Sequence, residues 1–150
     1  MSFSRHESGA AALELCLVLP ILLVLFIAVF DFGFLLFQQM QVEAAAGAGA
    51  LYAYNRGGTN FDAAQVASAV AGASYPTQTT IAADPAPYKA CGCLNPGGTG
   101  LVAASCGSVC SNGATAANYA VVSAKVTPTP IMSWPGYPAS LNSGVVIRLK

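Results

Sequence analysis

The chain has 150 residues, with six basic and six acidic side chains and no formal net charge. Without clustered Lys and Arg it lacks the charge that neutralises phosphates, so we expect no nucleic-acid partner. The single histidine is His6, and no general base accompanies a serine or cysteine. We therefore expect no enzyme, no catalytic residue, no cofactor and no bound metal.

Residues 10–37 are the most apolar part of the sequence. Residues 15–30 carry no charge, Pro20 is their only helix breaker, and Asp31 interrupts the run before residues 32–37 resume it. A bilayer core takes roughly 20 mostly apolar residues in a helix, whose backbone groups pair internally. We predict one transmembrane helix over about residues 10–37. A buried soluble helix is the alternative, but apolar side chains here cover every face rather than one stripe.

Charges flanking this span indicate its orientation. Arg5 precedes the apolar run, and the next positive charge, Arg56, lies well beyond it. Positive residues beside a span stay cytoplasmic. We therefore expect a cytoplasmic N-terminus and an exported C-terminal domain in a single-pass membrane protein.

Two modes of N-terminal processing are consistent with the apolar run. One is a secretory signal cut near the small residues 44–50, although the apolar core exceeds the usual 7–15 residues of such signals. The other removes only a leader, residues 1–9, and keeps the helix. A glycine, four residues and then a glutamate opening a long apolar helix favour the second mode. Here these positions are Gly9, Ala10 and Glu14.

The N-terminal third of the chain resembles the TadE-like pseudopilins of tight-adherence (Flp-type IVb) pili. The matching features are Glu14, Pro20, the triplet Asp31-Phe32-Gly33 and the small residues 44–50. One departure is Leu15, where the family usually carries an aromatic residue. The resemblance implies cleavage after Gly9 by the prepilin peptidase. It also implies a bacterial inner-membrane protein that can be incorporated in a pilus, and whose partners are other pilins and the pilus assembly machinery.

The carboxylates Glu14 and Asp31 are expected to serve assembly. They lie roughly 26 Å apart on a continuous helix, near opposite faces of a bilayer. Ionisable residues in a membrane cost a few kcal/mol and are usually functional or paired. Glu14 would pair with the α-amine that cleavage creates on Ala10 of its own or a neighbouring subunit. Asp31 would contact a partner helix, and hydration at the interfaces is the alternative for both.

The rest of the chain predicts an α+β fold. The first helix should continue over residues 10–55 and end at Arg56-Gly57-Gly58. A second helix is expected over residues 61–73, with an N-cap at Thr59-Asn60. Alternation then predicts a three- to four-stranded antiparallel sheet. Its candidate strands are residues 77–83, 88–93, 119–127 and 145–149, with loops at 95–98 and 111–113 and a proline-rich excursion at 127–138. The domain would span residues 56–150.

The cysteines predict disulfides in that domain. Cys91 and Cys93 lie before a glycine-rich loop, and Cys106 and Cys110 lie after it. Bonding Cys91 to Cys93 would be strained, which leaves two cross-pairings. A tetrahedral zinc site is the alternative, although zinc spacings usually begin with C-x2-C. Cys16, in the apolar run, is expected to be a small apolar residue without chemistry.

The sequence thus favours a membrane-anchored, pilin-like structural protein, a minor pilin or pseudopilin. The alternative is an uncleaved single-pass membrane protein whose exported domain binds a ligand or metal.

Overall fold

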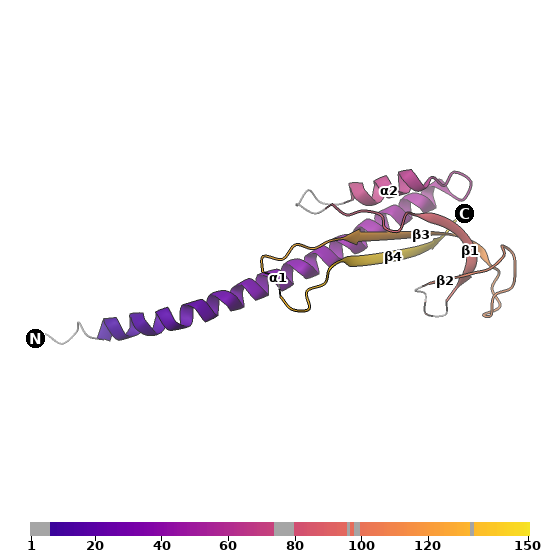
Figure 1. Cartoon of the computed structure of the whole chain (residues 1–150). Coiled ribbons are helices and arrows are strands. Elements are labelled where there is room, and N and C mark those ends of the chain that lie inside the picture. The colour runs from indigo at the N-terminus through magenta and orange to yellow at the C-terminus, as the bar shows by residue number, and fades with distance from the viewer. Residues whose placement is uncertain (1–6, 74–79, 96, 98–99, 133) are drawn as a thin grey trace, which may run out of the picture. The chain divides into compact units, whose positions relative to one another are not determined.

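The computed structural model describes residues 7–73, 80–95, 97, 100–132 and 134–150, with side chains from residue 12 onward. Within these ranges the fold is α+β, as predicted, and contains two helices and four strands (Figure 1). The elements are α1 (Glu7–Arg56), α2 (Ala63–Gly72), β1 (Tyr88–Leu94), β2 (Leu101–Ala103), β3 (Ala117–Val126) and β4 (Leu141–Arg148).

The chain divides into two compact units. The N-terminal unit comprises Met1–Leu36 and Thr129–Tyr137, and the C-terminal unit comprises Phe37–Pro128 and Pro138–Lys150. α1 supplies residues to both, and the proline-rich excursion between β3 and β4 belongs largely to the N-terminal unit.

The four strands form one antiparallel sheet in the order β2-β1-β3-β4. β3 is central and pairs with β4 from Tyr119↔Arg148 to Val126↔Leu141, and with β1 from Tyr88↔Val121 to Gly92↔Ala117. Alternate residues of β3 are buried, which is the period expected of a strand with one face on the core.

The core of the C-terminal unit lies between this sheet, α2 and the C-terminal part of α1. In Figure 1, α2 and the sheet lie beside the C-terminal part of α1. α1 presents small side chains at helical spacing, so α2 and β3 can approach it closely. The buried core residues are Val42, Ala45, Ala46, Ala50, Ala53, Val66, Val70, Ile81, Ala120, Val122, Ala124, Val126 and Leu149.

One predicted helix boundary, the end of α1, agrees with the structure, and another, the N-cap of α2, differs from it. α1 ends at Arg56 as predicted, because Gly57 adopts a positive φ of 72° and its N–H bonds back to Ala53. The N-cap of α2 is Asp62 rather than Thr59-Asn60, and Asp62 Oδ1 accepts from the Ala64 N–H at 2.9 Å. A carboxylate two residues before that N–H reaches it directly, whereas residues 59 and 60 lie too early.

One predicted strand is wrong in its described part, and one strand was missed. Residues 80–83 form no strand, and Ala82 makes only an isolated bridge to Lys125. β2 was not predicted, since its short segment Leu101–Ala103 gives little alternation. The remaining parts of the predicted strand 77–83 and loop 95–98, namely residues 77–79, 96 and 98, lie outside the described residues, as does most of the leader.

Candidate functional site

α1 is long and apolar enough to cross a membrane by length and composition, and it is the only such helix in the part of the chain that the structure describes. Its apolar surface is exposed around the helix, as a lipid-facing helix requires. Exposed side chains include Leu13, Leu17, Ile21, Leu25, Val29, Phe30 and Phe32. Cys16 is exposed on the same segment and forms no disulfide.

The predicted processing site lies at the start of α1. Gly9 and Ala10 are within the helical backbone, which begins at Glu7. The Glu14 side chain is exposed and has no hydrogen-bond or ion-pair partner among the described residues. Within the described part of the chain, the Glu14 carboxylate is therefore available to a partner from outside it.

Asp31 binds a distant segment of its own chain. Its Oδ1 accepts from the Ile131 backbone N–H at 2.9 Å, and its Oδ2 accepts from the Met132 N–H at 3.2 Å and from Trp134 Nε1 at 2.9 Å. The residue is 3 % exposed. Hydration, one of the two environments expected for Asp31, is therefore wrong for this structure. Three donors satisfy the carboxylate instead.

Tyr137 lies in the same unit, and the Asp31 carboxylate affects the pKa of its hydroxyl. Burial, followed by the nearby negative charge of Asp31, raises the pKa of the Tyr137 hydroxyl above its ordinary value. That hydroxyl is buried and has no hydrogen-bond partner among the described residues. The electrostatics of the Thr129–Tyr137 segment therefore depend on Asp31.

The partners of Asp31 were missed from the sequence because they follow it by about a hundred positions. The available signal was compositional. Residues 127–138 carry four prolines and the chain's single tryptophan. An indole N–H needs an acceptor when it is partly buried, so Trp134 itself indicated a hydrogen-bond acceptor elsewhere in the chain.

The four cysteines of the C-terminal unit form two disulfides. Cys91 is joined to Cys106 and Cys93 to Cys110, which is one of the two cross-pairings left open by the sequence. These bonds connect β1 to the loop before β3. Because all four thiols are used, none remains as a thiolate for the alternative zinc site. Among the described residues, no group of three metal-ligating side chains lies together.

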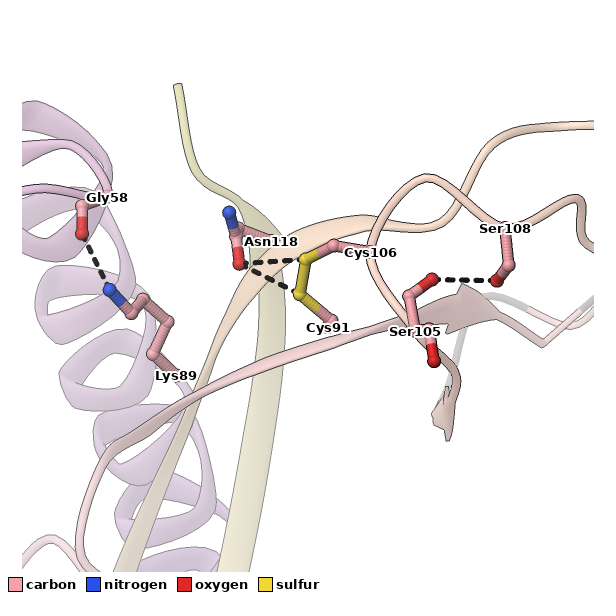
Figure 2. Close-up of a disulfide and its surroundings, with 7 residues drawn as sticks. All are labelled: Gly58, Lys89, Cys91, Ser105, Cys106, Ser108 and Asn118. Atoms are coloured by element: carbon pink, nitrogen blue, oxygen red, sulfur yellow. Dashed lines mark hydrogen bonds between the residues drawn. A yellow bond between two sulfur atoms is a disulfide. The ribbon is translucent and has the colours of Figure 1, made fainter.

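Local contacts position the first disulfide (Figure 2). Asn118 Oδ1 lies 3.0 Å from Cys91 Sγ and 3.4 Å from Cys106 Sγ. Since a disulfide sulfur has no hydrogen to donate, Asn118 packs against the bond rather than accepting from it. Lys89 Nζ donates to the Gly58 carbonyl at 2.8 Å, which links the start of β1 to the end of α1. The Ser108 hydroxyl closes the loop by donating to the Ser105 carbonyl at 2.7 Å.

Together, these features define a class of protein: a small α+β domain with two disulfides, carried on one N-terminal apolar helix suited to membrane anchoring. The model of the TadE-like protein family matches residues 9–51. The match confirms the resemblance found in the N-terminal third, and it points to a pilus-associated, structural protein. No curated protein and no solved structure matches the chain.

Proposed function

We propose that the chain is a minor pilin or pseudopilin that takes part in assembling a tight-adherence type IV pilus. The observation that carries the proposal is the TadE-like match over residues 9–51. The matched segment includes the glycine-to-glutamate spacing of a prepilin leader and the whole apolar run. The protein would act by helix-mediated assembly in the bacterial inner membrane, with its N-terminus cytoplasmic and its C-terminal domain exported.

In this proposal the prepilin peptidase removes the leader before assembly. Cleavage between Gly9 and Ala10 would leave α1 as the N-terminal helix of the mature chain and would create an α-amine four residues before Glu14. The exposure of the apolar surface supports this proposal, since other pilin helices or lipid would cover it in the membrane. The disulfides suit an exported domain, because such bonds persist in oxidising compartments.

Cleavage is tested by intact mass and N-terminal sequencing of the chain purified from a membrane that contains a prepilin peptidase. We expect a mature N-terminus at Ala10 and expect Gly9→Leu to leave the full-length chain, because the substitution removes the glycine of the glycine-to-glutamate spacing. Gly33→Leu, in the same helix, is the matched control and should be cleaved like the parent. A mature N-terminus at Met1, or one within residues 44–50, contradicts the proposal.

A further inference from the structure

Among the described residues, the side chain of Asp31 provides hydrogen bonds that attach the Thr129–Tyr137 segment to α1. Asp31 receives two consecutive backbone N–H groups, from Ile131 and Met132, and the indole N–H of Trp134. All of these residues belong to the N-terminal unit, so the contact lies within one compact body. The bonds set the position of the segment along the helix axis.

The side chains of Ile131 and Met132 are exposed, although their backbone N–H groups bond to the Asp31 carboxylate. Ile131 is 77 % exposed and Met132 is 39 % exposed. On α1, the residues flanking Asp31, Phe30 and Phe32, are also exposed. Large apolar side chains exposed on the same compact unit indicate a surface that something apolar covers.

The position of Asp31 along α1 indicates what covers this surface. Asp31 lies roughly 26 Å beyond Glu14, which is close to the thickness of a hydrocarbon core. The segment bound to it is thus placed near the membrane–water boundary on the side of the C-terminal domain. Tryptophan is enriched at that boundary because its ring is apolar and its N–H is polar. Trp134 has both a half-buried ring and a satisfied N–H.

We propose that Thr129–Tyr137 is a membrane-surface loop whose occupant is the lipid leaflet facing the C-terminal domain. Ile131 and Met132 insert among the acyl chains near the headgroups, and Trp134 lies at the boundary. Asp31 holds the loop at this depth. Lipid is favoured over a protein partner because the segment is fixed to an apolar helix at the height where lipid surrounds it. This inference concerns the anchored chain and does not depend on leader cleavage or pilus assembly.

The test uses Trp134 as a reporter, because it is the only tryptophan in the chain. The full chain is reconstituted in phosphatidylethanolamine–phosphatidylglycerol vesicles that contain lipids brominated at different acyl depths. We expect bromolipids to quench Trp134 fluorescence, most strongly when bromine lies nearest the headgroups. We also expect dissolved iodide to quench it weakly.

Two variants separate the loop's insertion from its attachment. Ile131→Ser with Met132→Ser keeps the backbone bonds to Asp31, and we expect loss of bromolipid quenching. Asp31→Asn replaces one accepting oxygen by a donor, so we expect a red-shifted emission and increased iodide quenching. Asp84→Asn is the matched control, since that carboxylate pairs with Lys125 in the C-terminal unit, and it should behave like the parent.

Three results of these quenching experiments would overturn the proposal. Strong iodide quenching without bromolipid quenching in the parent places the loop in water and overturns the proposal. Resistance to both quenchers means that protein covers Trp134, which also overturns it. Quenching that is unchanged in the double serine variant shows that Ile131 and Met132 are not the inserting groups, and the proposal then fails even if Asp31→Asn does not fold.

Discussion

At Gly49, α1 lies so close to α2 and β3 that a methyl group does not fit. A Cβ built at Gly49 would overlap Val70 Cγ2 and lie 2.9 Å from Val122 Cγ1, and both valines are fully buried. Gly47, one half-turn earlier, has open space around the same position. The two glycines therefore have different roles, although both lie in a helix that glycine disfavours.

We predict opposite effects for alanine at these two positions. Gly47→Ala should stabilise the domain by up to about 1 kcal/mol through helix propensity. Gly49→Ala should destabilise it, because overpacking costs about 1–3 kcal/mol and exceeds the same propensity gain. Urea unfolding of the full chain in detergent micelles, followed by circular dichroism, measures both. If Gly49→Ala is as stable as Gly47→Ala, the neighbouring valines move aside freely and the packing argument is wrong.

Tyr137 predicts a response to alkaline pH. The pKa of Tyr137 is raised in the folded chain, so folding favours its neutral hydroxyl. The contribution of this group to the free energy of unfolding is fully present below the unfolded pKa of about 10. It is lost as the pH rises through the pKa of the folded chain. Tyr137→Phe keeps the ring and removes the ionisable hydroxyl. We expect the variant to keep its Trp134 emission at pH values where the parent's emission changes. Parallel titrations of parent and variant from neutral pH to about pH 11 check this, and identical curves would show that Tyr137 is not responsible.

At the scale of elements, the sequence predicted the helices and strands that short-range residue patterns determine. The continuous apolar run predicted the long helix, and Gly57 marked its end. Alternation predicted β1, β3 and β4, although their bounds differ by up to a few residues. What local pattern could not determine was pairing. Ala82 lies in a segment of strand-like composition that makes one bridge, and β2 exists because β1 offers it an edge.

The candidate site residues divide in the same way, into those readable from local spacing and those whose partners lie far along the chain. Gly9 and Glu14 are separated by only four residues, so their spacing was readable directly from the sequence. Asp31 was recognised as unusual for its setting, but its donors lie too far along the chain for any local pattern to identify. The cysteine spacing limited the disulfides to two cross-pairings, and the choice between them depends on how the loop after β2 folds back onto β1.

The disulfides predict a stability loss that is confined to the C-terminal unit. The bonds Cys91–Cys106 and Cys93–Cys110 close sequence separations of 15 and 17 residues. Serine at both members of one pair should cost about 3 kcal/mol in the chain-entropy model. Cys16→Ser, outside the paired set, should have no effect on unfolding. Non-reducing peptide mapping identifies the pairs, and four thiols that alkylate without reduction would contradict this arrangement.

At the scale of the whole molecule, the exposed Glu14 predicts a defect in assembly rather than folding. If the leader is removed, the Ala10 amine, with a reference pKa near 7.7–8.0, becomes available to pair with this carboxylate in the same or a neighbouring subunit. Such a pair would set the axial register between helices, since buried ion pairs contribute specificity more readily than net stability. We expect Glu14→Gln to insert, fold and be cleaved, but to lose co-purification with partner pilins and reduce pilus yield.

The matched control for this experiment is Glu43→Gln. Glu43 lies in α1 beyond the apolar run, is exposed, and accepts a hydrogen bond from Gln39 at 3.2 Å, a bond that the amide oxygen can also accept. It should assemble like the parent. Normal processing and assembly of Glu14→Gln would mean that Glu14 is only a hydrated interfacial residue.

The separation in sequence between Asp31 and its donors has a consequence during synthesis. The Ile131 N–H is supplied 100 residues after the carboxylate that it binds. At about 5–20 residues per second, Asp31 waits roughly 5–20 s before that donor is made. In this interval the carboxylate lacks these donors, so no bond to the loop holds the nascent helix at one depth. If the loop lies at the membrane surface as proposed, the final depth of the helix is set only when the late segment arrives. A ribosome-bound chain halted before Thr129 should therefore show a more variable insertion depth than the finished protein.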